Sequence, residues 1–115
     1  MGYVSVGEVN QLAESAMMEV EAGGREILLA RVGERFYAVD SRCPHMGGRL
    51  AQGRLEGTVV TCPRHGSQFD LVNGNVVRWL QGSGLLSRIG TALKSPRSLM
   101  TYNVKVERGE ILVEV

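Results

Sequence analysis

Short runs of apolar and β-branched residues, separated by glycine-containing turns, follow one another along this chain of 115 residues. Runs of this length, with turn residues at close intervals, are typical of β-hairpins. The pattern therefore predicts a single all-β domain, residues 1–115. The predicted strands are YVSV (3–6), MMEV (17–20), REILLARV (25–32), RFYAVD (35–40), TVVT (58–61), 67–72, 75–77, TYNVKVE (101–107) and EILVEV (110–115).

Two-residue turns connect several of these predicted strands. Gly33-Glu34 separates the third strand from the fourth, and Arg108-Gly109 separates the last two. Asn73-Gly74 strongly favours a two-residue hairpin, so we expect 67–72 to turn there and return through 75–77. These turns predict that strands adjacent in the sequence pair with each other.

One segment has a different period. In residues 83–96 the apolar positions repeat at helical spacing, and Pro96 follows them as a stop signal. Gly84 and Gly90 each weaken a helix by about 1 kcal/mol relative to alanine. We predict a short amphipathic helix near residues 84–94. Its apolar face consists of Leu85, Leu86, Ile89 and Leu93.

The charges of the chain are balanced overall, with 13 Lys and Arg against 12 Asp and Glu, but they are unevenly distributed. Residues 1–40 contain three arginines and seven acids, a net charge of −4, whereas residues 41–115 contain ten bases and five acids, a net charge of +5. The overall balance does not suggest a nucleic-acid-binding protein. No apolar run approaches the ~20 residues of a membrane span. No secretory signal is visible, so we expect a soluble cytoplasmic protein.

Only two cysteines and two histidines are present, and they lie in two short segments. The first segment is Cys43-Pro44-His45 and the second is Cys62-Pro63-Arg64-His65. Two cysteines cannot form a disulfide-rich scaffold, and in the cytoplasm they are expected to stay reduced. Two loops that each carry a thiolate and an imidazole offer four ligands, which suit zinc or an iron–sulfur cluster.

The spacing within the two segments favours the cluster over zinc. Structural zinc sites usually combine two cysteines in one segment with two histidines in another. Here each segment mixes the two residue types, and a single residue separates Cys43 from His45. This spacing suits two adjacent irons better than one tetrahedral ion. Cys43 and Cys62 can then hold one iron, while His45 and His65 hold the other.

The spacing C-x-H-x16-C-x2-H, with proline after both cysteines and glycine after the second histidine, resembles the motif of the Rieske [2Fe–2S] family. The resemblance extends to RFYAVDSRCPHMGGRL (35–50), to residues 53–70 and to the terminal hairpin 102–115. It implies a Rieske-like antiparallel β-sandwich or barrel, with a small cluster-binding subdomain of two loops at about residues 41–72. It also implies one [2Fe–2S] cluster. The implied ligands are Cys43, His45, Cys62 and His65.

The resemblance further identifies residues expected around the cluster: Pro63, Gly66 and Ser67. Ser67 stands at the position of a serine that hydrogen-bonds the cluster in high-potential members. Phe69 replaces the tyrosine of those members and has no hydroxyl, so we expect a low potential within the family range of roughly −150 to +300 mV. The extra cysteine pair of respiratory Rieske proteins is absent. This resembles the soluble, oxygenase-associated branch of ferredoxins.

Rieske oxygenases have a second domain with a mononuclear iron, which needs two further histidines and a carboxylate. The chain has neither the length nor the histidines for it. We therefore expect a non-catalytic, monomeric one-electron carrier between a reductase and a terminal oxidoreductase such as a ring-hydroxylating dioxygenase. Two alternatives remain open. One is a small electron-transfer subunit of a multi-component, nitrite-reductase-like enzyme, and the other is a structural zinc or redox-sensing module.

Arginines are concentrated around the ligand segments. We expect Arg42, Arg49, Arg64 and Arg54 to surround the cluster, where they steer an acidic partner or simply form a charged surface. Residues 78–97 depart from the family, whose short members have a shorter connection there. This segment either covers the β-core or forms a docking, membrane-surface or oligomer contact.

Overall fold

The computed structural model describes residues 2–44, 47–64, 66–78 and 98–115. These residues form eleven strands and two short 3-10 helices, η1 (Val9–Gln11) and η2 (Leu50–Gln52). Every strand pairing is antiparallel, which confirms the all-β prediction. The strands are β1 (Tyr3–Glu8), β2 (Met17–Ala22), β3 (Arg25–Val32), β4 (Arg35–Asp40), β5 (Arg54–Glu56), β6 (Val59–Thr61), β7 (Gln68–Asp70), β8 (Val76–Arg78), β9 (Thr101–Tyr102), β10 (Val104–Glu107) and β11 (Glu110–Glu114).

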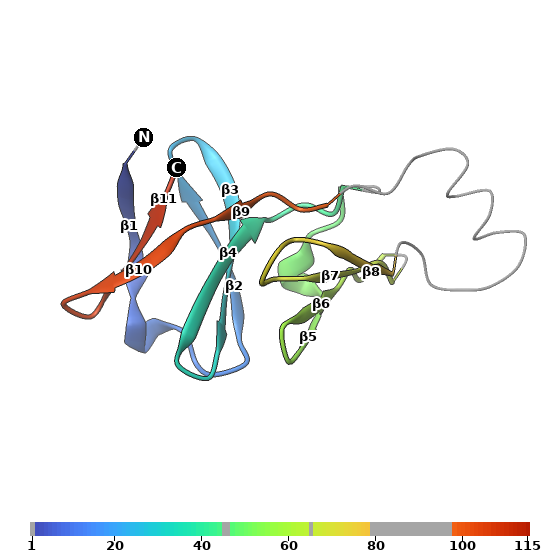
Figure 1. Ribbon diagram of the computed structural model, residues 1–115, viewed down its shortest axis with the longest axis horizontal. Helices are drawn as coiled ribbons and strands as arrows, with labels where there is room; N and C mark the ends of the chain where they lie inside the picture. Colours follow the sequence, from blue (N-terminus) through green and yellow to red (C-terminus); the bar gives the residue numbers. More distant parts are fainter. Residues whose placement is uncertain (1, 45–46, 65, 79–97) are drawn as a thin grey trace, which may run out of the picture.

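The strands form three sheets, in the orders β1-β11-β10, β2-β3-β4-β9 and β5-β6-β7-β8. In Figure 1 the sheet that contains β3 and β4 lies between the other two. The small sheet β5–β8 lies at the end of the molecule where the two ligand segments are found. Among the described residues, no helix is long and apolar enough to cross a membrane.

Side chains of the central sheet point alternately into two hydrophobic clusters. On β3, Leu28 and Ala30 pack in the cluster shared with the small sheet, whereas Ile27 and Leu29 pack in the cluster shared with β11. All four are completely buried. Successive residues of a strand face opposite sides of a sheet, so a strand covered on both faces is apolar at every position. This explains the uninterrupted apolar run in REILLARV.

Two of the predicted turns are confirmed. Gly33-Glu34 joins β3 to β4 with Gly33 at φ 63°, and Arg108-Gly109 joins β10 to β11 with φ of 52° and 79°. Both central residues of the Arg108-Gly109 turn have positive φ, and the first central residue of the Gly33-Glu34 turn does; both patterns match the right-handed twist of a hairpin. The prediction of a two-residue turn at Asn73-Gly74 is wrong, because β7 ends at Asp70 and β8 begins at Val76.

The longer turn between β7 and β8 has two physical causes. Leu71 is 2% exposed and belongs to the core, so the chain cannot reverse immediately after it. Carboxylate and amide side chains then bond the backbone two residues ahead: Asp70 Oδ1 accepts the Val72 N–H at 2.9 Å, and Asn73 Oδ1 accepts the Asn75 N–H at 2.9 Å.

The predicted strand 101–107 is divided between two sheets at Asn103. β9 pairs with β4, and β10 pairs with β11. The Asn103 side chain donates to Glu114 Oε1 at 2.9 Å, and its carbonyl accepts the Glu114 N–H at 2.9 Å. These bonds stabilise the transition between the sheets. The helix predicted near residues 84–94 lies outside the described residues.

Candidate metal centre

The first ligand loop is the segment that begins at Cys43 and ends at Gly48. Two backbone hydrogen bonds of Cys43 close it. The Cys43 N–H donates to the Gly48 carbonyl at 2.8 Å, and the Cys43 carbonyl accepts the Gly47 N–H at 2.8 Å. Arg42 and Arg49 form an antiparallel bridge on either side of the loop. Gly47 adopts φ 72°, a conformation that favours glycine. The loop therefore has a defined backbone frame that positions the thiol.

The second ligand loop, between β6 and β7, has the same frame nineteen residues later. The Cys62 N–H donates to the Ser67 carbonyl at 2.8 Å, and the Cys62 carbonyl accepts the Gly66 N–H at 3.1 Å. Gly66 adopts φ 76°, and Thr61 pairs with Gln68 across the base of the loop. The backbone hydrogen bonds described for the two loops are thus equivalent, although the loops differ in sequence.

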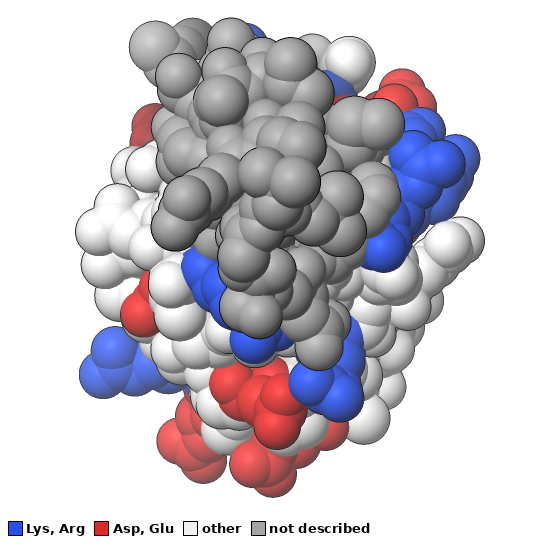
Figure 2. Space-filling model, turned by 90° about the vertical axis from the view of Figure 1, so that its right-hand side faces the viewer, with Lys and Arg blue, Asp and Glu red and all other residues white. Residues whose placement is uncertain are grey.

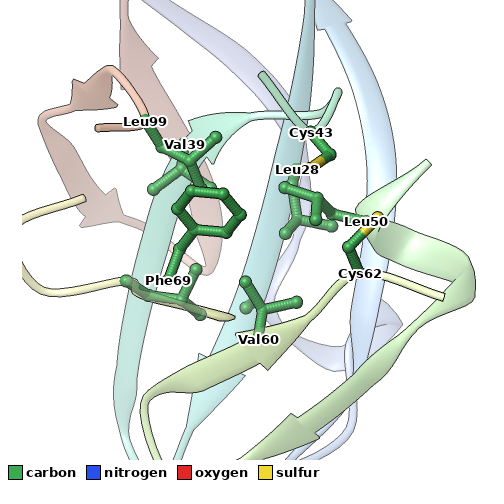
Figure 3. Packing of buried hydrophobic residues seen from close by; sticks show 10 residues of the cluster. Leu28, Val39, Cys43, Leu50, Val60, Cys62, Phe69 and Leu99 are labelled. Carbon is green, nitrogen blue, oxygen red and sulfur yellow. The ribbon is translucent and has the colours of Figure 1, made fainter. Parts of the chain in front are cut away.

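Both thiols are buried at one end of the core. Cys43 is 2% exposed and Cys62 is 3% exposed. They belong to the hydrophobic cluster that contains Phe69, and Figure 3 shows both on the same side of that cluster, near Leu28 and Leu50. No disulfide joins them. Two thiols from separate loops, held together in apolar surroundings, are suited to ligate a soft metal centre.

The two loops touch at Gly48. A Cβ atom on Gly48 would lie 2.9 Å from the Cys62 Sγ and 3.0 Å from the Arg64 side chain. Real Cβ atoms do not approach sulfur so closely, so the backbone of the first loop reaches the second thiol only because residue 48 is glycine. This contact brings the two cysteine-bearing loops into one site.

Asp40, at the end of β4, joins the start of the first loop to β9. Its Oδ1 accepts the Tyr102 hydroxyl at 2.8 Å, and its Oδ2 accepts the Met100 N–H at 3.1 Å. Burial raises the pKa of Tyr102, and the hydrogen bond to Asp40 raises it further, while Arg25 opposes the shift. The pair fixes the β4 end from which the first ligand loop departs.

A basic depression of about 240 Å³ lies between the two loops. It is lined by Arg42, Gly47, Gly48, Arg49, Gln52, Pro63 and Arg64. Arg54, which the sequence also suggested, instead pairs with Glu56 at 3.0 Å and does not line it. Figure 2 shows Lys and Arg side chains bordering the undescribed residues at this end of the molecule, with acidic side chains grouped below them.

The sequence model of the Rieske [2Fe-2S] domain family matches residues 2–87, which is most of the chain. The chain belongs to the Rieske [2Fe–2S] family. Its cofactor is accordingly one [2Fe–2S] cluster. The buried thiol pair and the convergent loops fit this group, because the cysteine sulfurs of such clusters are held in apolar surroundings by loops with fixed backbones.

Proteins similar to this Rieske chain include ferredoxins of the same size. The ferredoxin component of the naphthalene 1,2-dioxygenase/salicylate 5-hydroxylase systems of Ralstonia sp. is 27% identical over 115 residues, 98% of this chain and 95% of that protein. Human apoptosis-inducing factor 3 is 36% identical over 109 residues, which cover 95% of this chain but 16% of that protein.

Among solved structures, the Rieske chain resembles one from the complex of reduced oxygenase and oxidized ferredoxin in carbazole 1,9a-dioxygenase. The TM-score is 0.77 at 26% identity, and the match covers 96% of this chain and 91% of that chain. The sandwich with a two-loop cluster end, expected from the sequence, is thereby confirmed.

The remaining predicted site residues divide into described and undescribed ones. Gly66 and Ser67 are buried, whereas Pro63 is exposed beside Arg64. Phe69 is completely buried in the cluster that contains both cysteines. His45 and His65 lie outside the described residues, so their role as ligands rests on the motif.

Two contacts of the ligand loops were not predicted from the sequence. Arg78 Nε and Nη2 donate to the Gly66 carbonyl, and Arg42 Nη1 donates to the Gly47 carbonyl. Arg78 was only one of several arginines in the basic half of the chain. Its contact arises from the pairing of β8 with β7, for which the Asn73-Gly74 motif predicted a shorter turn and a returning strand that ended at residue 77.

Proposed function

We propose that this protein is a one-electron carrier that accepts electrons from a reductase and passes them to a terminal oxidoreductase such as a ring-hydroxylating dioxygenase. The observation that carries the proposal is the convergence of two equivalent loops on a buried thiol pair. A chain that spans 95% of the length of a dioxygenase-system ferredoxin supports it. The protein then acts without catalysing a reaction of its own.

We assign the ligands as Cys43 and Cys62 on one iron and His45 and His65 on the other. When bound, the cluster supplies one-electron oxidation and reduction. The chain keeps water from both thiols by burying them, and it fixes their positions through the two backbone frames. Ser67, completely buried in the second loop, is proposed to hydrogen-bond the cluster.

The partner surface is proposed to be the depression lined by Arg42, Arg49 and Arg64, because it lies between the two ligand loops. Arg42 pairs with Glu26 at 3.5 Å and Arg49 with Glu19 at 2.8 Å, yet both arginines remain about half exposed. Exposed cations at this position attract an acidic partner and accelerate its docking.

Residues 1–115 are proposed to act as one domain, with about 41–72 as its cluster-binding part. We also propose that the carrier is a monomer and works in the cytoplasm, where Cys43 and Cys62 stay reduced until the cluster is loaded. Nucleic acid is not proposed as a partner, since the overall charge is +1.

The proposal is tested by counting electrons and following their transfer. The purified holoprotein should take up one electron per chain in an anaerobic dithionite titration, with a Rieske-type electron paramagnetic resonance signal. Mixed in a stopped-flow instrument with the oxidised terminal oxygenase of a naphthalene dioxygenase system, the reduced protein should be reoxidised stoichiometrically. Zinc in place of iron and sulfide, or substrate turnover by the chain alone, would refute the proposal.

A second function, an electron-transfer module of a larger enzyme, is favoured by one observation. Human apoptosis-inducing factor 3 is 36% identical to this chain over only 16% of its own length, so the same domain is found within a much longer protein. Affinity purification from the native cell distinguishes the two. A carrier is recovered alone, whereas a subunit is recovered in fixed stoichiometry with an enzyme.

A further inference from the structure

Each ligand loop has one backbone carbonyl that is held by an arginine, and the two carbonyls are equivalent. In the first loop, Arg42 Nη1 donates to the Gly47 carbonyl at 3.2 Å. In the second loop, Arg78 donates to the Gly66 carbonyl twice, from Nε at 3.1 Å and from Nη2 at 3.0 Å. Gly47 and Gly66 each lie four residues after a cysteine and adopt positive φ. Each arginine thus binds the backbone carbonyl of the glycine that lies four residues after the cysteine of its loop.

The two arginines differ in origin and in charge compensation. Arg42 belongs to the loop that it holds, is 45% exposed and pairs with Glu26. Arg78 comes from β8, is partly buried and takes part in none of the ion pairs of the described residues. The sequence 79–97 that follows it contains no Asp or Glu. Arg78 therefore places an uncompensated positive charge against the second ligand loop.

We propose that Arg78 is a positioning residue of the second ligand loop and that its charge raises the reduction potential of the bound cluster. This inference rests on the proposed function, because it takes Cys62 and His65 as ligands. It adds a residue remote in sequence from the motif to the groups that determine how the site works.

The first part of the inference follows from the geometry of the Gly66–Ser67 peptide. This peptide is trans, so the Ser67 N–H points away from the Gly66 carbonyl and hence away from Arg78. The Gly66 N–H is bonded to the Cys62 carbonyl, so both sides of Gly66 are fixed. Hydrogen bonds from a guanidinium are stronger than neutral ones, and two of them define the carbonyl direction. The Gly66–Ser67 peptide is therefore held in a single orientation.

The second part follows from electrostatics. Reduction adds one negative charge to the cluster, and a nearby cation stabilises the more negative state. Partial burial weakens the screening of such a charge by solvent. Removal of the Arg78 charge should lower the equilibrium constant for reduction by about threefold to tenfold. At 59 mV per tenfold change for one electron, this is a fall of roughly 30–60 mV.

The test compares four holoproteins in redox titrations followed by visible absorption. Arg78→Gln should have a lower potential than the wild type, whereas Arg78→Lys, which keeps the charge, should stay close to it. Arg54→Gln is the matched control, because Arg54 lies in the same small sheet but is 70% exposed and paired with Glu56. A wild-type potential in Arg78→Gln, or equal falls in the Gln and Lys variants, would overturn the charge effect.

Hydrogen–deuterium exchange of the same holoproteins, together with Arg42→Gln, tests the positioning role. In Arg78→Gln, peptides covering 62–68 should exchange faster, while those covering 43–48 stay at the wild-type rate because Arg42 still holds the first loop. Arg42→Gln should give the reverse pattern. Unchanged exchange at 62–68 in both Arg78 variants would overturn the positioning role. If Arg78→Gln does not retain its cluster, Arg78→Lys tests the positioning role: an ammonium cannot reproduce the two guanidinium bonds to the Gly66 carbonyl, so 62–68 should still exchange faster, and a potential well below the wild type would overturn the charge effect.

Failure of this inference is distinguishable from failure of the proposed function. If the wild-type protein holds no iron and sulfide, the proposed function fails, and the inference fails with it. If the wild-type protein takes up one electron but the Arg78 variants match it in potential and in exchange, only the inference fails.

Discussion

Gly48 shows how a single residue without a side chain controls the site. Its Cα lies where an added Cβ would be 2.9 Å from the Cys62 Sγ, so any larger residue must displace a proposed ligand. Gly47, beside it, has a different reason to be glycine: its φ is 72° and nothing lies within 4 Å of an added Cβ. One glycine is required for space and the other for backbone conformation.

Gly48→Ala is therefore expected to lose most of its cluster. The added methyl moves the Cys62 thiol away from the position that Cys43 complements, and iron bound per chain should fall several-fold. Gly2→Ala is the control, because nothing lies within 4 Å of its Cβ position and its φ is not positive, and it should retain the iron of the wild type. Iron and sulfide analysis after identical reconstitution gives the result. Full iron content in Gly48→Ala would show that the loop contact is not needed.

At the scale of elements, the most specific connection is the one between β4 and β9. β9 has only two residues, and it pairs with β4 through Ala38 and Val39. The Asp40 carboxylate adds two bonds, to the Tyr102 hydroxyl and to the Met100 N–H. So short a strand depends on side-chain bonds for its position. The first ligand loop begins directly after this connection.

The raised pKa of Tyr102 makes this connection sensitive to alkaline pH. Burial and the Asp40 hydrogen bond favour the neutral phenol, so the folded protein holds the proton more tightly than the unfolded chain. The resulting stability is fully present below the unfolded pKa of about 10 and is lost as pH rises through the folded pKa. The free energy of unfolding should thus fall above pH 10 by more in the wild type than in Tyr102→Phe. Parallel curves in urea denaturation would contradict this.

The sequence predicts those elements whose turns are defined locally. Gly33-Glu34 and Arg108-Gly109 are correct because a glycine at positive φ lies within each two-residue turn. Asn73-Gly74 is misleading, since the burial of Leu71 lengthens the turn. The division at Asn103 cannot be read from the alternation of residues 101–107, because both halves are extended and differ only in their partners.

The candidate site divides in the same way. Cys43 and Cys62 stand out from their spacing, since each loop is a local structure closed by its own hydrogen bonds. Gly48 and Arg78 do not stand out, because their contacts join segments far apart in the chain. The Asn73-Gly74 motif predicts that residues 75–77 return beside 67–72, but it does not predict the register that brings Arg78 to Gly66.

For the whole molecule, the separation of charge along the chain becomes in part a separation in space, although Glu26 and Glu19 pair with Arg42 and Arg49 beside the ligand loops. Residues 1–40, which have a net charge of −4, form β1 of the sheet β1-β11-β10 and three strands of the central sheet. Lys and Arg side chains border the cluster end, as Figure 2 shows. A molecule with this polarity turns its basic end toward an acidic partner before contact. The overall charge of +1 conceals this orientation.

The rate of electron transfer to an acidic acceptor should consequently fall as salt increases, because the Debye length shortens to about 8 Å at 0.15 M ionic strength. Arg64→Gln should lower the second-order rate constant severalfold at low salt and much less at 300 mM salt. Arg35→Gln, which removes an exposed charge at the opposite end of β4, should have little effect at either. Equal rates for both variants at low salt would argue against docking at the arginine-lined depression.

The contacts on either side of residues 79–97 have a consequence for how this protein tolerates change. Arg78 is held on Gly66, and the Leu99 N–H is bonded to the Gly74 carbonyl at 2.8 Å, so each end is anchored on its own. A substitution that breaks one of these two bonds should accordingly leave the other in place, so the two described flanks respond to change independently.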